Sequence, residues 1–330
     1  MPTLYDVAAI GNAIVDVIAP ASDDFLTEES LIKGSMALID DDQALSLYSR
    51  MAAGVEASGG SAGNTIAGLS SLGGRGAFIG KVAADTLGEV YAHDMEALGA
   101  VFGGDRLPAG GAATGRCLIN VTPDGQRTMS TYLGAAALLS PSDVKPEIVE
   151  AAKVVYLEGY LFDPPDARRA FAKAAGLARA SGRLIALTLS DAFVVDRHRD
   201  ALRGFIETEV DILFANEAEI TSLFETASFD EAAAAVRGLA KIVAVTRSEQ
   251  GCVVVTGDQI HTIEAVAVKK VVDTTGAGDQ YAAGFLFGLT QGRSLEHSAR
   301  LGSLAAAEVI AHYGPRPQVS LRDLAVEAGL

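Results

Sequence analysis

Residues Val271 to Leu289, VVDTTGAGDQYAAGFLFGL, join a glycine-rich turn to an apolar helix. The β-branched pair Val271-Val272 predicts the end of a strand, and 273–278 predicts a tight turn. From Asp279 onward the apolar residues recur at helical spacing. A glycine turn that opens a helix leaves backbone N–H groups unpaired at the positive end of the helix dipole. The sequence therefore predicts an anion site at this turn.

Asp279 is the unusual residue here, because a carboxylate repels a phosphate unless it has chemical work to do. Service as a general base for an attacking hydroxyl would be such work. The alternative is that Asp279 caps its helix. Other phosphate motifs fit worse: the Walker pattern needs Gly-Lys-Ser/Thr, which the chain lacks, and the dinucleotide fingerprint needs a small residue where Tyr281 stands.

The sequence DTTGAGD at 273–279 resembles the C-terminal signature of the ribokinase-like (PfkB) carbohydrate and nucleoside kinases. The resemblance implies that Asp279 is the catalytic base and that the amides of Gly276, Ala277 and Gly278 form the anion hole. It also implies ATP and Mg²⁺ as cofactors. The implied fold is α/β: a three-layer α/β/α sandwich with a mostly parallel sheet and a small discontinuous β lid.

Composition limits the alternatives. The chain has 330 residues, 49% of them hydrophobic, and a net charge of −16. An acidic surface argues against nucleic acid and anionic membranes as partners. The thiols of Cys117 and Cys252 fit no metal spacing, and no apolar run reaches 18 residues. We expect a cytoplasmic enzyme, monomer or homodimer, whose partners are a small-molecule nucleoside or sugar and ATP.

A second glycine turn leads into a helix predicted over 62–72. The motif EASGGSAGNTIAGL at 56–69 resembles the family's N-terminal signature, in which the second glycine and the asparagine bind the sugar. Those positions are Gly60 and Asn64. A serine after the two glycines is closer to adenosine kinases than to ribokinase, which has lysine there.

The same turn offers a rival function. Gly59-Gly60-Ser61-Ala62-Gly63 fits the Gly-x-Ser-x-Gly nucleophile elbow of serine hydrolases. Such an elbow follows a buried strand, and 54–57 does not predict one. His297 and His312 are available as partners, but nothing in the sequence selects either.

Near the N-terminus, 5–10 predicts a buried strand and 13–19 a second apolar run that contains Asp16. A buried carboxylate must be hydrogen-bonded, so Asp16 faces either solvent on an edge strand or a ligand. The resemblance implies that Asp16 holds two sugar hydroxyls, with Asn12 as a helper. A carboxylate suits a vicinal diol because it offers two acceptor oxygens.

A hairpin is predicted at 116–133, with TPDGQ as its turn. We assign 13–45 and 105–135 to the β lid, and 1–12, 46–104 and 136–330 to the kinase core. Arg127 follows the hairpin turn, where an arginine is commonly solvated. Similarity to adenosine kinases implies instead that Arg127 swings onto the phosphates.

From residue 141 strands and helices alternate, which predicts a doubly wound parallel sheet with ligands at the carboxyl ends of its strands. Polar residues lie at those ends. Asn216 and Glu219 match the family's Asn-x-x-Glu motif for magnesium and phosphate, although asparagine is also a favoured helix N-cap. Thr246 and Arg247 are expected near the nucleotide.

The family resemblance further implies a monovalent cation, K⁺, at a corner formed by Asp273, Thr275 and Gly314. We expect an ATP-dependent phosphotransferase that acts on the 5′-hydroxymethyl of a nucleoside, with adenosine as the preferred substrate. The alternatives are a kinase for ribose, fructose, inosine or guanosine, a nucleoside sensor without catalysis, and the hydrolase that uses Ser61.

Overall fold

The computed structural model describes residues 2–257 and 259–330, and its larger sheet has nine strands. In chain order these are β1 (Tyr5–Ile10), β5 (Gly76–Ile79), β7 (Val101–Phe102), β11 (Ala152–Glu158), β12 (Leu184–Thr188), β13 (Ile212–Asn216), β14 (Ile242–Thr246), β15 (Cys252–Thr256) and β16 (Gln259–Ile263). Their spatial order is β16-β15-β14-β13-β12-β11-β1-β5-β7. Pairing is parallel except at β14-β15 and β15-β16. The predicted mostly parallel sheet is confirmed.

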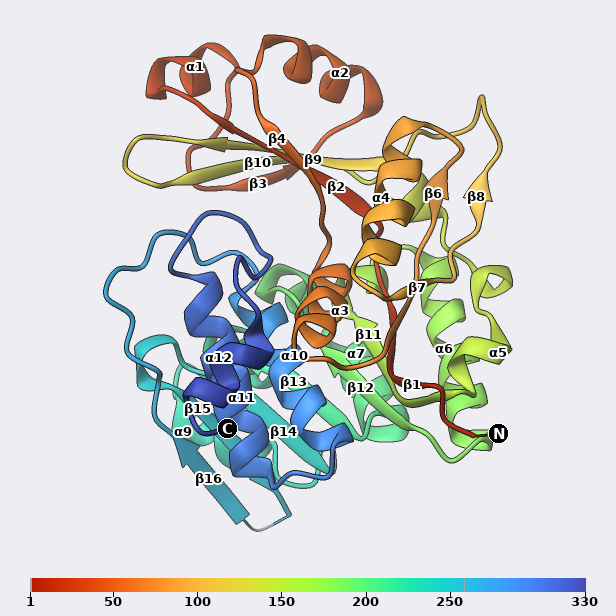
Figure 1. Ribbon diagram of the computed structural model, residues 1–330, viewed down its shortest axis with the longest axis vertical. Helices are drawn as coiled ribbons and strands as arrows, with labels where there is room; N and C mark the ends of the chain where they lie inside the picture. Colours follow the sequence, from red (N-terminus) through yellow and green to blue (C-terminus); the bar gives the residue numbers. More distant parts are fainter. Residues whose placement is uncertain (1, 258) are drawn as a thin grey trace.

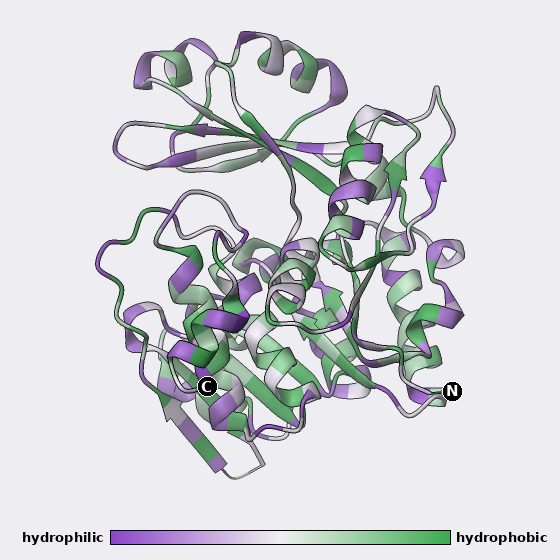
Figure 2. Ribbon diagram, viewed as in Figure 1, coloured by the Kyte–Doolittle hydropathy of each residue, from purple (hydrophilic) through white to green (hydrophobic). Residues whose placement is uncertain are grey.

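Helices cover both faces of this sheet (Figure 1). On one face lie α3 (Ser61–Ser71), α4 (Thr86–Ala97), α10 (Ala277–Thr290) and α11 (Leu295–Val309); on the other lie α6 (Pro165–Ala180), α7 (Ala192–Glu209), α8 (Glu217–Phe224) and α9 (Phe229–Ala235). The strands alternate accordingly: Tyr156 packs with α3 and α10, while its neighbours Val155 and Leu157 pack with the second set. Apolar residues concentrate on these strands (Figure 2). This is the expected three-layer sandwich.

Apart from two helices of the smaller sheet, the remaining helices are short. They are α5 (Pro146–Val149), α12 (Leu321–Glu327) and the 3₁₀ turns η1 (Gly134–Leu138), η2 (Pro141–Asp143), η3 (Gly159–Phe162) and η4 (Ser248–Gln250). The α12 helix packs Leu321 and Ala325 against Leu72 and Leu301, which lie beside α3 and on α11. It therefore links α3 to α11, which itself packs along α10.

A second, five-stranded sheet stands apart from the first in Figure 1. Its strands are β2 (Ile14–Pro20), β3 (Met36–Leu38), β4 (Val55–Ser58), β9 (Gly115–Val121) and β10 (Arg127–Tyr132), in the order β3-β10-β9-β2-β4. The helices α1 (Asp23–Glu28) and α2 (Asp41–Arg50) cover one face, where Val17, Leu47 and Leu118 are buried. A two-stranded ribbon, β6 (Val82–Ala83) and β8 (Arg106–Leu107), lies nearby. This sheet is the small lid sheet that the resemblance implied.

Most local predictions are confirmed, including the β9-β10 hairpin, which is antiparallel. The prediction of a strand end at Val271-Val272 is wrong. Val272 donates its N–H to the carbonyl of Ile310, after α11, and Val271 is 55% exposed, so the pair joins a loop rather than a sheet. The β15-β16 hairpin was not predicted.

The division into core and lid segments remains a prediction, and β4 of the lid sheet comes from the 46–104 segment that we assigned to the core. No helix in residues 2–257 and 259–330 is long and apolar enough to cross a membrane.

Candidate active site

The larger sheet has its topological switch point at β1. The chain passes from β1 to β5 on one side, and later to β11 on the other. In open α/β sheets, ligands bind beyond the carboxyl ends of the strands at such a point. Asn12, just after β1, donates its side-chain Nδ2 to Oε1 of Glu158, the last residue of β11, at 2.8 Å. The predicted helper Asn12 therefore lies where this topology places ligands.

Glu158 joins three segments at this point. Its carboxylate also accepts from the backbone N–H of Asn12 and, at 2.9 Å, from the N–H of Ala62 at the start of α3. The side chain is fully buried, and burial raises the pKa of Glu158 to about 7. The sequence analysis did not predict Glu158 as a site residue. The available signal was an acidic residue closing an apolar strand.

Asp16 is buried in the lid sheet, with 7% of its surface exposed. Its strand β2 is flanked by β4 and β9, so the interpretation as a solvent-facing residue on an edge strand is wrong. Asp16 pairs in register with Cys117. Burial raises the pKa of Asp16 to about 7, and the charges of Arg316 and Arg127 oppose that rise.

Two consecutive glycines bring the backbone against these residues. A Cβ on Gly59 would lie 2.2 Å from Oδ2 of Asp16, and one on Gly60 would lie 2.2 Å from the carbonyl of Asn12. Gly60 also has φ of 81°, in the left-handed region that favours glycine. The predicted residues Asn12, Asp16 and Gly60 are therefore brought together at the junction between lid and core.

Asp279 lies in the first turn of α10, and its side chain contacts the first turn of α3 at this junction. Helix α10 begins at Ala277, after Gly276 in the left-handed conformation, and Gly278 has open space beside it. Oδ1 of Asp279 accepts from the Ser61 hydroxyl at 2.6 Å, and Oδ2 accepts from Nδ2 of Asn64 at 3.0 Å. Its carboxylate is thus directed at α3 instead of capping its own helix.

The pKa of Asp279 is raised to about 6, because burial outweighs the two hydrogen bonds that favour its charged form. A carboxyl group with this pKa is largely ionised at neutral pH and can accept a proton. The N-terminal amides of α10 precede it directly, so a proton acceptor and an anion site lie side by side.

Arg127 reaches from the lid to the turn that precedes α10. Its Nε lies 2.9 Å from Oδ1 of Asp273, and both side chains are largely buried, so the interpretation as a solvated strand end is wrong. Asp273 also accepts from the N–H and hydroxyl of Thr275, each at 2.8 Å, and from the N–H of Gly314 at 3.0 Å. The predicted corner of Asp273, Thr275 and Gly314 is assembled.

Asn216 and Glu219 form a reciprocal cap at the start of α8. The Asn216 side chain accepts from the Glu219 N–H at 2.8 Å, and Glu219 accepts from the N–H and Nδ2 of Asn216. The capping interpretation is therefore correct for the geometry. Glu219 is buried, its pKa is raised to about 7 by burial, and the charges of Asp191 and Asp279 act in the same direction.

Thr246 ends β14 beside Asn216, its partner in the sheet register. The Arg247 guanidinium is held by Glu217, at 2.8 Å from Nε, and lies 3.6 Å from the centre of the Phe229 ring. The Arg247 side chain therefore contacts α8 and α9. Thr246 instead lies at the carboxyl edge of the sheet, beside Asn216.

The hydrolase interpretation of Ser61 is wrong. Its hydroxyl donates to a carboxylate rather than to an imidazole, and His312 is hydrogen-bonded to Glu308 and Tyr313. The preceding strand β4 begins with exposed residues, Val55 and Glu56, whereas a nucleophile elbow follows a buried strand.

Arg316 is a further residue that sequence reasoning missed. Burial lowers its pKa, and the charges of Tyr91, Asp16 and Asp94 oppose that change. Its Nε is buried without a hydrogen-bond partner among the described residues. The signal in the sequence was slight: one arginine between two prolines, Pro315 and Pro317.

The geometry can be compared with known proteins. The model of the pfkB family carbohydrate kinases matches residues 6–321. The chain belongs to this family. A structure of adenosine kinase from Sinorhizobium meliloti is 53% identical, with a TM-score of 0.92, and the alignment covers 98% of this pfkB kinase and 99% of that chain.

Two other relatives span similar lengths. A structure described as a probable sugar kinase protein from Rhizobium etli CFN 42 is 48% identical, with a TM-score of 0.93 and 99% of both chains covered. Adenosine kinase from Saccharomyces cerevisiae is 29% identical over 93% of this pfkB kinase and 95% of its own length.

Proposed function

We propose that this chain is an ATP-dependent adenosine kinase, which transfers a phosphoryl group to the 5′-hydroxymethyl of adenosine. Similarity to two proteins described as adenosine kinases, one of them 53% identical over nearly the full length, supports the reaction. The observation that favours a nucleoside over a free sugar is the surface around Asp16.

That surface is apolar. Asp16 shares a face of β2 with Ile14 and Ile18, because alternate residues of a strand point the same way. The cluster on this face also includes Cys117, Ile119, Met129, Leu133 and Ala136. A carboxylate set in apolar surface suits a ligand with hydroxyls beside a flat apolar part. A ribose joined to a purine has this composition, whereas a free sugar lacks the apolar part.

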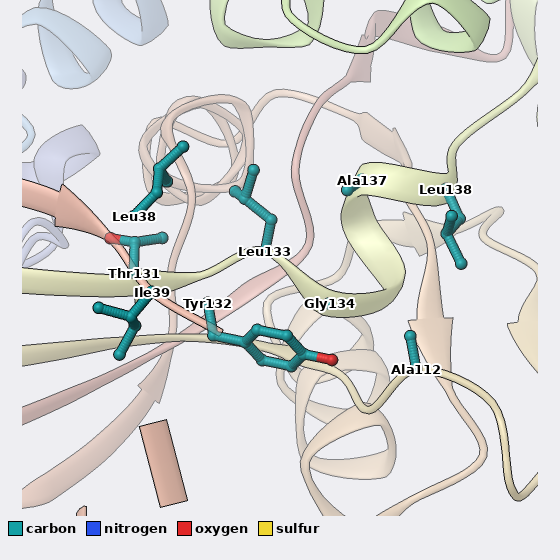
Figure 3. Close-up of a pocket in the computed structure, with 9 residues that line it drawn as sticks. All are labelled: Leu38, Ile39, Ala112, Thr131, Tyr132, Leu133, Gly134, Ala137 and Leu138. Atoms are coloured by element: carbon teal, nitrogen blue, oxygen red, sulfur yellow. The ribbon is translucent and has the colours of Figure 1, made fainter. Parts of the chain in front are cut away.

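An apolar cavity of about 330 Å³ shares Leu133 with this cluster (Figure 3). Leu38 lines it from β3, Leu133 lines it from the residue between β10 and η1, and Ala137 and Leu138 line it from η1. The hydroxyl of Thr131, another lining residue, donates to the sulfur of Cys117, the register partner of Asp16. The volume lies within the range of small-ligand pockets, so we assign the purine to this cavity.

In the proposed reaction Asp16 accepts hydrogen bonds from the ribose diol, and the backbone at Gly60 and the side chains of Asn64 and Asn12 complete the sugar site. Asp279 accepts the proton of the 5′-hydroxyl as that oxygen attacks the phosphoryl group. The amides of 276–278 stabilise the developing negative charge, the term that dominates such catalysis.

ATP and Mg²⁺ are the proposed cofactors; bound Mg²⁺ neutralises phosphate charge. Glu219 fits a role near the metal, because it is a buried carboxylate acted on by two further negative charges, Asp191 and Asp279. A divalent cation would relieve that repulsion. Asn216 and Thr246 would lie at the same edge, and Arg247 would support it through Glu217.

The proposed K⁺ corner fits less well. Both oxygens of Asp273 already accept hydrogen bonds, and the Arg127 guanidinium supplies a positive charge there. We therefore derive no step through a monovalent ion, and turnover in K⁺ compared with tetramethylammonium measures any requirement. We propose that Arg127 leaves Asp273 to meet the phosphates of ATP.

The deciding experiment is a measurement of ADP release with adenosine, inosine, guanosine, ribose and fructose, using wild type and Asp279→Asn. The proposal requires adenosine to give the highest kcat/KM and Asp279→Asn to abolish most turnover. A preference for ribose or fructose would refute the nucleoside assignment. Adenosine binding without ADP release in wild type would instead identify a sensor.

A further inference from the structure

Helices α3 and α10 are fixed against each other next to the proposed base. A Cβ on Gly68 of α3 would fall 2.0 Å from Oε1 of Gln280, so no larger residue fits between the helices there. Nε2 of Gln280 donates to the carbonyls of Asn64 and Pro315, each at 3.0 Å. The separation between the N-termini of α3 and α10 is therefore set by buried packing.

Because this separation is fixed, two hydrogen-bond donors on the first turn of α3 reach the Asp279 carboxylate. Ser61 and Asn64 are three residues apart, so they lie on one face of the helix. Each donates to a different oxygen of Asp279, at 2.6 Å and 3.0 Å. An ionised carboxylate has about four lone-pair positions, so about two remain for a substrate hydroxyl.

We propose that Ser61 is a positioning residue for Asp279: its hydroxyl fixes the orientation of the carboxylate and stabilises its ionised form. The proposal rests on the proposed function, in which Asp279 is the general base. Asn64 has a proposed contact with the sugar, whereas Ser61 is free to serve Asp279 throughout the reaction.

The surroundings of Asp279 disfavour its ionised form. The ionisable groups whose charges interact with Asp279 come from β2, β11, η3 and α8: Asp16, Tyr156, Glu158, Tyr160 and Glu219. Each of these is negative when ionised, so none favours a charged Asp279. Burial opposes the charge as well, and the hydrogen bonds from Ser61 and Asn64 are what favour it.

The first test needs no turnover. The Asp279 carboxyl is titrated by ¹³C NMR in protein labelled at aspartate, and its signal is identified by its loss in Asp279→Asn. Ser61→Ala should raise the pKa by about one unit, a tenfold change in ionisation equilibrium. Ser71→Ala removes a hydroxyl from the far end of α3, where it accepts from the N–H of Leu321, and should leave the titration unchanged. An unchanged Asp279 pKa in folded Ser61→Ala would overturn the proposal.

The second test uses the kinetics. The acid limb of the kcat profile should move to higher pH in Ser61→Ala, with turnover about tenfold lower below the limb, little change above it, and an unaltered KM. Ser61→Thr keeps a hydroxyl and should restore the wild-type limb. If Ser61→Ala instead lowered KM with no change in the limb, the hydroxyl would be a competitor of the substrate, and the proposal would fail.

The two tests separate this proposal from the proposed function. If wild type phosphorylated none of the five substrates while the NMR pKa still rose in Ser61→Ala, the kinase assignment would fail and the positioning role would stand. If adenosine turnover were high and neither the NMR titration nor the acid limb responded to Ser61→Ala, the reverse would hold.

Discussion

Gly59→Ala isolates the role of Asp16 with the addition of one methyl group. Gly59 lies outside the left-handed region, unlike Gly60, so alanine fits its backbone and the effect comes from the Cβ alone. That atom would lie 2.2 Å from Oδ2, 2.4 Å from Cγ and 2.7 Å from Oδ1 of Asp16. Ordinary contact begins at 3.4 Å, so the carboxylate must move by 3.4 − 2.2 = 1.2 Å at Oδ2.

A displacement of this size is large for a binding group. A misplacement of about 1 Å costs roughly 10²-fold in rate, so kcat/KM for adenosine should fall by about that factor. Wild type should also prefer adenosine over 2′-deoxyadenosine by roughly 10²-fold, the value of one lost charged hydrogen bond. This preference should shrink in Gly59→Ala, because the displaced carboxylate no longer meets both hydroxyls.

Steady-state kinetics on both nucleosides provide the assay. Gly204→Ala is the matched control: this glycine is exposed on α7 and a Cβ there would meet nothing within 4 Å. It should keep full activity and raise the free energy of unfolding by up to about 1 kcal/mol. If folded Gly59→Ala kept kcat/KM for adenosine within about threefold, a change below 1 kcal/mol, the placement of the diol against Asp16 would be refuted.

Three further predictions follow from the charges at the site. Asp279→Asn should retain adenosine binding by calorimetry and lose about 10²–10⁴ in kcat; near-normal turnover would exclude it as the base. Burial raises the pKa of Asp16 to about 7. Because protonation removes a hydrogen-bond acceptor, kcat/KM for adenosine should fall as the pH drops below that value. The fall should be weaker for 2′-deoxyadenosine, and parallel pH profiles for the two nucleosides would contradict this role of Asp16. Arg127→Met leaves the buried Asp273 carboxylate without its charged partner and should lower the free energy of unfolding, measured by urea titration, by about 3 kcal/mol. The double variant Arg127→Met/Asp273→Asn should be less destabilised than the sum of the two single variants. Full additivity would show that the two side chains are not coupled.

Local motifs were enough to predict the parts of the site that a few consecutive residues define. The turn before Asp279 and the glycines before Asn64 each open a helix, so these two turn-helix junctions were predictable from the local sequence, although the segments before them were not. Asp16 was recognisable because a carboxylate inside an apolar run needs a partner.

Contacts between distant segments could not be predicted in this way. Ser61 and Asp279 are 218 residues apart, and Asn12 and Glu158 are 146 apart. Such pairs depend on which strands and helices become neighbours, and no local pattern encodes that. The error at Val271 has a related cause, because β-branched residues favour a strand only where a partner strand is available.

The long separations between these partners also govern when the enzyme becomes competent during its synthesis. Asp16 and Asn64 leave the ribosome early, whereas Asp279 follows Asn64 by 215 residues. At 5–20 residues per second this delay is roughly 10–40 s. During this delay the nascent chain contains the residues proposed to bind the sugar but lacks the proposed base. In the proposed mechanism, a chain truncated before residue 279 lacks the base that activates the attacking hydroxyl.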